Sequence, residues 1–215
     1  HYYDIHHVPF RAWLIAWLPR LYIPGMMVRP LTNFVTSTAL FKRLIGFSVK
    51  RPIPALSRVT LRRWEKRHER KSGQVNGSKG TVCLFADEFT NYNESDIGIK
   101  AVMLLERLGY SVIIPRHRES GRTFLSKGLI RSARKLALKN ILMLKDVVSD
   151  ERPLIGIEPS ALLTFRDEYP DMAGEALAED ARNIARNALL FEEFISRETE
   201  RGNITPDQFT DKALN

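Results

Sequence analysis

Cysteine is almost absent from this sequence of 215 residues, in which Cys83 is the only one. A single cysteine excludes an internal disulfide, and it excludes any metal or iron–sulfur site built from several cysteines of this chain. Cys83 lies in the apolar run TVCLF. A reactive thiol needs exposure and a lowered pKa, so we expect this one to be buried and inert.

Long apolar runs are also missing. Apolar residues recur with helical spacing over residues 10–18 and 31–47, but each run falls short of the roughly 20 residues that span a bilayer. Prolines predict that this region is divided into short helical pieces. They stand at Pro9, Pro19, Pro24, Pro30, Pro52 and Pro54.

Two interpretations of residues 1–60 remain open. The segment is either a helical bundle that packs on a neighbouring domain or a segment that lies in a membrane interface. In the second case Trp13, Trp17, Tyr22 and Met26 would be its apolar side, and the cations that meet anionic headgroups would be Arg11, Arg20, Arg29, Lys42 and Arg43.

Acidic residues are scarce at the front of the chain. Residues 1–80 hold 15 Lys or Arg and 3 Asp or Glu, whereas residues 81–215 hold 18 and 22. The charged run RVTLRRWEKRHERK over residues 58–71 favours a solvated linker helix, and we expect no nucleic-acid partner because no base-reading module accompanies it. The small polar residues of SGQVNGSKG predict a linker. We therefore divide the chain into a basic helical connector (1–71), a linker (72–80) and an α/β unit (81–215).

Familiar catalytic motifs are missing as well. The sequence contains no GxGxxG, GxxxxGK[ST] or HExxH pattern and no nucleophile elbow, and no spacing matches a known metal set. We therefore expect no catalytic residue and no metal site. The chain begins HYYDIHHVPF, without an initiator Met, a basic n-region or a signal-peptide cleavage site, and we expect it to be part of a larger protein.

Strand and helix patterns alternate after residue 80. Apolar runs predict strands at residues 81–89, 111–115 and from 154, and amphipathic patterns predict helices at 96–110, 125–148 and 176–200. Asp96 is the expected N-cap of the first of these helices, and Gly109 its end. The order predicts an α/β fold with a Rossmann-like half-sheet of three or more parallel strands, flanking helices and a preceding helical segment.

Charged loops follow the three predicted strands, at residues 86–95, 115–127 and 158–168. Loops at one edge of a parallel sheet converge. One interpretation is an anion or acid–base site, in which His117 titrates near neutrality and Arg122 binds a carboxylate. The other is a buried ion-pair network. The candidate residues are Arg116, His117, Arg122, Glu158, Arg166 and Asp167.

Three phrases in these loops, FADEFTNYNESDIG, RHRESGRTFLSKGL and IEPSALLTFRDEYP, resemble a known family. It is the cysteine-rich (CCG) domain of heterodisulfide reductase subunits, of the iron–sulfur subunit of anaerobic glycerol-3-phosphate dehydrogenase, and of the C-terminal part of FAD-linked 2-hydroxy-acid oxidases. The last group, of the D-lactate dehydrogenase or glycolate oxidase type, is the most similar. The front segment resembles, more loosely, the helical connector that follows the ferredoxin-like segment there.

The chain departs from this family at every cluster cysteine. Those positions fall on Glu88, on Glu119 and Ser120 ahead of Gly121, and on Ala161. An iron–sulfur cluster needs thiolates, whereas carboxylates suit hard cations and an alanine binds nothing. The resemblance therefore implies a degenerate repeat without its own cluster, in which ion pairs among Arg116, Glu119, Arg122 and Glu158 hold the loops beside a vacated pocket.

The resemblance implies a function for the parent protein. It would be a flavin- and iron–sulfur-dependent oxidoreductase that oxidises a 2-hydroxy acid, with FAD and clusters in other domains and a second cysteine-bearing repeat beyond residue 215. This part, with no cofactor of its own, would be an electron-transfer or scaffold module that contacts the flavin and ferredoxin-like domains. We expect a cytoplasmic protein, peripheral to the inner face of the membrane. The alternative is a non-catalytic docking domain for a membrane surface or a partner subunit.

Overall fold

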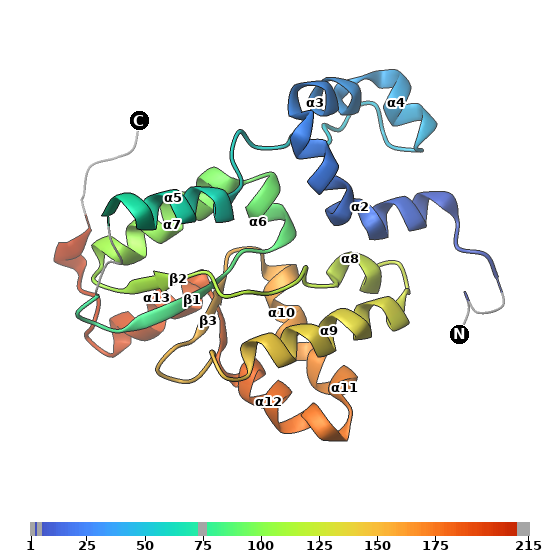
Figure 1. Cartoon of the computed structure of the whole chain (residues 1–215). Coiled ribbons are helices and arrows are strands. Elements are labelled where there is room, and N and C mark those ends of the chain that lie inside the picture. The colour runs from blue at the N-terminus through green and yellow to red at the C-terminus, as the bar shows by residue number, and fades with distance from the viewer. Residues whose placement is uncertain (1–2, 4–5, 73–76, 210–215) are drawn as a thin grey trace.

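A computed structural model describes residues 3, 6–72 and 77–209. Within these residues, four parallel strands form one sheet in the order β2-β1-β3-β4 (Figure 1). The strands are β1 (Thr81–Phe85), β2 (Ser111–Ile113), β3 (Leu154–Gly156) and β4 (Ala188–Leu190). The structure therefore confirms the predicted α/β fold with a parallel sheet and a preceding helical segment.

Both faces of the sheet are covered, as expected of parallel strands. Val82 and Leu84 of β1 belong to the core on one face, and Cys83 and Phe85 belong to the core on the other. The helices of the first face are α5 (Leu61–Ser72), α7 (Ser95–Arg107) and α13 (Phe191–Glu200). Those of the second are α9 (Ile130–Leu144), α10 (Pro159–Asp167), α11 (Tyr169–Ala173) and α12 (Ala178–Arg186). Cys83 is fully buried, and burial raises its pKa to about 11, which confirms the inert thiol.

Short elements complete the body. They are α6 (Glu88–Tyr92), α8 (Arg122–Leu125), and the 3-10 helices η1 (Glu175–Leu177) and η2 (Pro206–Gln208).

The helix predicted at residues 176–200 is wrong, because a strand interrupts it. Asn187 ends α12, and Ala188, Leu189 and Leu190 pair in register with Leu154, Ile155 and Gly156. The sequence ALL is a good helix former, but the unpaired edge of β3 offers it buried main-chain partners. Tertiary pairing therefore overrides the local propensity.

Two other helix predictions need correction. The helix predicted at 125–148 is shorter and corresponds to α9, because α8 ends at Leu125 and Gly128 turns the chain at a φ of 71° before α9 begins. Asp96 is not the N-cap of α7 but lies in its first turn, where a carboxylate also favours the helix dipole. Gly109, with a φ of 97°, does follow the end of α7.

The charged run at residues 58–71 is not simply a solvated linker helix. Its helix α5 buries Leu61 completely in the core shared with α7. A Cβ atom at Gly98 of α7 would lie 2.6 Å from Leu61 Cδ2, so α7 can pack so closely only with a glycine there. The opposite side of α5 is exposed. The predicted linker at 72–80 lies partly outside the described residues.

The front segment consists of α2 (Phe10–Met27), α3 (Arg29–Ser37) and α4 (Ala39–Leu44). Pro19 and Pro24 lie inside α2 and do not end it, contrary to the prediction. The single helix predicted at 31–47 breaks at Thr38, whose Oγ1 accepts a hydrogen bond from Phe41 N and caps α4. In the described part of the chain, no helix is both long and apolar enough to cross a membrane.

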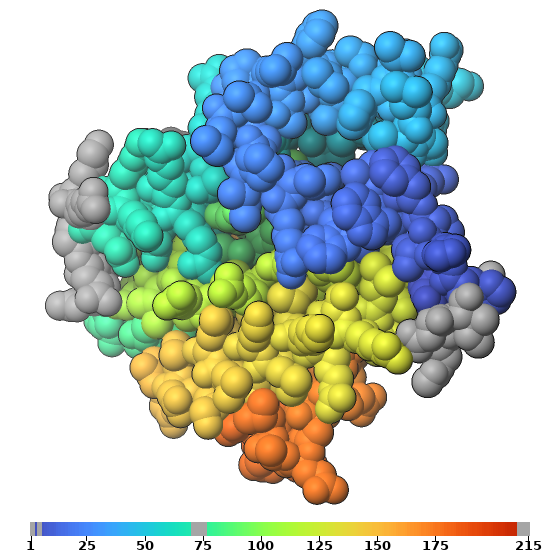
Figure 2. Space-filling view, turned by 45° about the vertical axis from the view of Figure 1, so that its right-hand side comes forward, coloured from blue at the N-terminus to red at the C-terminus, as the bar shows by residue number. Residues whose placement is uncertain are grey.

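Helix α2 lies along α8, where the blue segment meets the yellow one in Figure 2. Trp17 packs edge-on against Phe124 with ring centroids 5.3 Å apart, and Thr123 Oγ1 donates to Ala16 O at 2.9 Å. Trp17, Tyr22, Arg20 and Lys42, which the interfacial interpretation placed at the lipid, therefore face the protein in whole or in part. Helix α2 covers the polar loops and forms one wall of the site.

Candidate functional site

Glu88 and Ser120, two residues at positions where the resemblance implies lost cysteines, bind each other. Glu88 begins α6 directly after β1, and Ser120 lies in the loop after β2; both are buried. Ser120 N donates to Glu88 Oε2 at 3.0 Å, and Ser120 Oγ donates to Glu88 Oε1 at 2.7 Å. A carboxylate and a hydroxyl thus join the loops after β1 and β2.

Burial raises the pKa values of two neighbouring carboxyl groups after β1. It raises the pKa of Glu88 to about 7, and the neighbouring Asp87 adds to the effect, although the bonds from Ser120 oppose it. Burial also raises the pKa of Asp87 to about 6. Asp87 caps α6, because its Oδ1 accepts hydrogen bonds from Phe89 N at 2.8 Å and Thr90 N at 2.9 Å.

A buried polar network fixes the loop after β2. Tyr169 of α11 donates its hydroxyl to Ser120 O at 2.9 Å. Asn140 of α9 donates to the same hydroxyl at 2.8 Å and to Glu119 O at 3.0 Å, and it accepts from Arg118 N at 2.7 Å. Sequence reasoning missed both residues. Tyr169 lies in the phrase IEPSALLTFRDEYP, but nothing in the helical pattern of α9 distinguishes Asn140.

The remaining degenerate positions do not join this pair. Ala161 is a residue of α10 and is buried in the apolar core. Gly121 takes a φ of 82°, which a glycine adopts readily, and its turn leads into α8. Glu119 turns away to Arg20 of α2, with Oε1 and Nε 2.8 Å apart.

The predicted ion-pair network is wrong in its pairings. Arg122 does bind a carboxylate, but it is that of Glu168, at 2.8 Å. Arg166 pairs with Glu193 of α13 at 2.7 Å. Arg116 and Asp167 are exposed, and neither they nor Glu158 form an ion pair within the described residues. Glu158 accepts from Ser160 Oγ instead, at 2.7 Å. The partners Arg20 and Glu193 come from helices that the sequence analysis did not place near the loops.

His117 does not titrate near neutrality, contrary to the prediction. Its ring lies against Phe85 with centroids 4.4 Å apart. Nδ1 lies 2.8 Å from Arg118 O, so this nitrogen carries the proton and donates, while the buried Nε2 has no hydrogen-bond partner among the described residues. Burial and the nearby Arg62 cation lower the pKa of His117 to about 3. The imidazole is therefore neutral, and the acid–base interpretation is wrong.

A pocket of about 180 Å³ lies beside the bonded pair Glu88–Ser120, between α2, α5, α6 and the loop after β2. A pocket is thus present where the resemblance implied one, and its origin in a lost cluster stays a prediction. Its charged lining residues are Arg20, Arg62, Glu88, Arg118 and Glu119. The described residues contain no group of three or more His, Cys, Asp or Glu side chains that could hold a metal ion.

The residues at the degenerate positions do not fit an iron–sulfur cluster. Both oxygens of Glu88 are engaged by Ser120, Ala161 is buried with no donor atom, and Cys83 is buried within β1. A cluster would need thiolates at positions where this chain has a hydrogen bond and a methyl group.

Comparison with known proteins reveals relatives among dehydrogenases. One subunit of the anaerobic glycerol-3-phosphate dehydrogenase of Escherichia coli K12 is 26% identical over 210 residues, which cover 95% of this chain and 51% of that protein. D-2-hydroxyglutarate dehydrogenase of Pantoea ananatis is 30% identical over 152 residues, or 71% of this chain and 13% of that protein. The Escherichia coli K12 enzyme of the same name is 27% identical over 184 residues, which cover 80% of this chain and 18% of that protein.

The chain spans about half the length of the first of these relatives and less than a fifth of the other two. No protein-family model and no solved structure matches it. The relatives confirm the resemblance carried by the three loop phrases. The chain is homologous to a segment that this glycerol-3-phosphate dehydrogenase subunit shares with the D-2-hydroxyglutarate dehydrogenases.

Proposed function

We propose that this chain is a cluster-free scaffold module of a larger flavin- and iron–sulfur-dependent dehydrogenase that oxidises a 2-hydroxy acid. The observation that carries the proposal is the bond between Glu88 and Ser120, because it fills two of the positions where the resembling repeats carry cysteines. The names of the relatives, with D-2-hydroxyglutarate and glycerol-3-phosphate as substrates, support oxidation of a small hydroxylated anion.

The division of labour follows from the residues. FAD and the iron–sulfur centres, bound by other domains, would supply hydride and electron transfer. The residues of this chain supply rigidity. Asn140 and Tyr169 hold the loop after β2, Arg122 of α8 pairs with Glu168 at the end of α10, and Arg166 of α10 pairs with Glu193 of α13. Such a module would hold neighbouring electron-transfer domains at a fixed separation.

Anaerobic reconstitution with iron and sulfide tests the absence of a cluster. The chain should emerge colourless and without bound iron, because it lacks thiolates at the strand-end loops. A matched variant carries cysteine at four positions and should bind iron. Its substitutions are Glu88→Cys, Glu119→Cys, Ser120→Cys and Ala161→Cys. Stoichiometric iron and sulfide in the unaltered chain would contradict the proposal.

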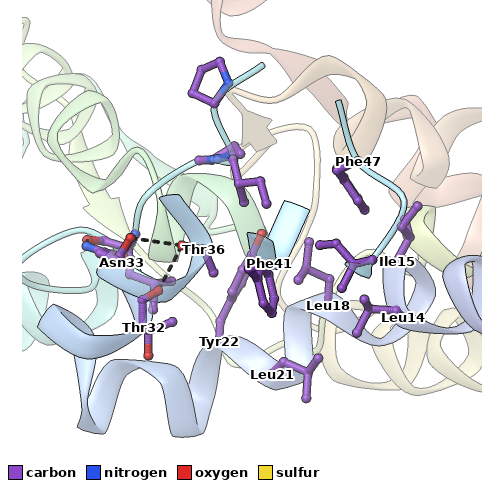
Figure 3. Close-up of a pocket in the computed structure, with 15 residues that line it drawn as sticks. Leu14, Ile15, Leu18, Leu21, Tyr22, Thr32, Asn33, Thr36, Phe41 and Phe47 are labelled. Atoms are coloured by element: carbon purple, nitrogen blue, oxygen red, sulfur yellow. Dashed lines mark hydrogen bonds between the residues drawn. The ribbon is translucent and has the colours of Figure 1, made fainter. Parts of the chain in front are cut away.

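A second candidate function, docking, is favoured by the front segment. Of the 17 large hydrophobic side chains that are exposed in the described part of the chain, 12 lie within residues 10–49. An apolar pocket of about 260 Å³ opens in the same segment, and Figure 3 shows Leu14, Leu18 and Phe41 around it. The exposed cations Arg11 and Arg43 lie in this segment too, so its chemistry suits an anionic membrane surface.

A further inference from the structure

We infer that the pocket at the carboxyl ends of β1 and β2 binds a small oxyanion, held by the guanidinium groups of Arg62 and Arg118. This site goes beyond the scaffold function and does not depend on it. Both arginines line one cavity, neither has a carboxylate within ion-pair distance among the described residues, and the other lining groups leave a net positive charge.

Arg62 reaches the pocket from α5. Its Nη2 donates to Pro115 O at 3.0 Å, and its backbone N–H donates to Asn91 Oδ1 at 3.1 Å. Among the described residues, no carboxylate lies within ion-pair distance of it. Burial lowers the pKa of Arg62, and the more distant Glu65 of the same helix opposes this effect without cancelling it. A guanidinium has several N–H donors, and a partly buried cation without a counterion in direct contact is costly. An anion in the pocket would satisfy the donors that Pro115 leaves free.

Arg118 reaches the same pocket from the loop after β2. Its side chain is exposed and likewise lacks an ion pair within the described residues. Its backbone is fixed, because Arg118 N donates to the buried Asn140 at 2.7 Å. The base of this side chain is therefore positioned before any ligand arrives, which lowers the ordering cost of binding.

The other charged groups of the lining leave a net positive charge. Arg20 and Glu119 pair with each other at 2.8 Å. Glu88 is the other carboxyl group of the lining, and it carries at most one negative charge against the two positive charges of Arg62 and Arg118. The lining therefore remains positive by at least one charge. The pocket, at about 180 Å³, is smaller than the roughly 300–1,000 Å³ of sites for drug-sized ligands, so it suits an ion of the size of phosphate or a short 2-hydroxy carboxylate.

Titration calorimetry of the full chain with inorganic phosphate, and separately with D-lactate, tests the site in chloride buffer of matched ionic strength. At least one anion should bind saturably, and the stronger of the two identifies its class. Arg118→Gln should weaken binding by roughly tenfold or more, because bonds to a charged group are lost. Arg62→Gln should act in the same direction.

Arg116→Gln is the matched control, because Arg116 is an exposed arginine of the same loop that does not line the pocket. It should leave the affinity unchanged. The exposed position of Arg118 makes its variant the decisive one if Arg62→Gln proves unstable. Failure of the unaltered chain to bind either anion, or equal losses in Arg116→Gln and Arg118→Gln, would overturn the inference. Neither result bears on the iron-binding test of the scaffold function.

Discussion

The carboxyl group of Glu88 shows how one side chain can join two strand-end loops. Both oxygens accept bonds from Ser120 in a place that water does not reach. Burial disfavours the charged form of a carboxyl group, and hydrogen bonds to its oxygens only partly offset that cost. Burial in the folded state therefore favours the protonated form of Glu88, although its bonds to Ser120 favour the charged form.

Glu88→Gln should change how stability depends on pH. The pKa of Glu88 is raised in the folded state from 4.5 to about 7. Its stabilising contribution is therefore fully present below about pH 4.5 and lost as the pH rises through about 7. The amide does not titrate, so the variant should gain stability relative to the unaltered chain as the pH rises. Urea unfolding at about pH 5 and about pH 8 measures this difference.

The titration of His117 changes stability with pH in the opposite direction to that of Glu88. His117 is present both in Glu88→Gln and in the unaltered chain. Its folded pKa is lowered to about 3, so protonation of the unfolded chain removes stability as the pH falls below 6.5. Comparing Glu88→Gln with the unaltered chain at each pH cancels the contribution of His117. The contribution of Asp87 does not cancel fully, because its charge interacts with that of Glu88. Parallel stability curves for the two proteins would show that Glu88 does not titrate as described.

At the scale of elements, α5 joins the basic front of the chain to the sheet. Its exposed cations account for its charged sequence, but Leu61 anchors it under Gly98 of α7. The same helix places Arg62 at the pocket, one residue after its anchor. Packing of one apolar side chain therefore decides where the neighbouring guanidinium lies.

Leu61→Ala should lower the free energy of unfolding by about 2–5 kcal/mol, because it leaves a cavity in a closed core. Arg63→Ala, at an exposed position of the same helix, is the control and should change it by about 0.5 kcal/mol or less. Thermal or denaturant unfolding of both variants measures the effects. Similar small effects of both substitutions would mean that α5 is only a linker.

At the scale of the whole molecule, charge and exposed apolar surface are concentrated at one end. The front segment holds most of the exposed large hydrophobic side chains of the described residues and covers the strand-end loops from α2. If the front segment contacts a membrane or a partner, the sheet and its pocket would lie on the other side of α2 from that contact.

Co-sedimentation with vesicles tests the docking function. The chain should bind vesicles rich in anionic lipid and release them at high salt, because cations and apolar groups act together. Phe34→Glu with Leu40→Glu should abolish binding, and Leu142→Glu on α9 is the control, as it also replaces an exposed hydrophobic residue. Absence of binding to any vesicle would leave a protein partner as the remaining occupant.

The sequence by itself determined several features of this protein. The absence of cysteine at Glu88, Ser120 and Ala161 is read from the residues themselves, and the parallel sheet follows from the alternation of strand and helix patterns. The basic front and the inert Cys83 follow from composition and from an apolar strand. Each of these depends on residue types or on a local period, which a linear sequence displays directly.

Only the tertiary structure decided the rest. Strand β4 exists because the edge of β3 pairs with a segment whose local pattern is helical. His117 is neutral and the pKa of Glu88 is raised to about 7 because side chains distant in sequence exclude water from them. Arg20 pairs with Glu119 across 99 residues of chain, which leaves Arg62 and Arg118 as the unpaired cations of the pocket. Burial and long-range pairing depend on which segments meet, and no local pattern records that.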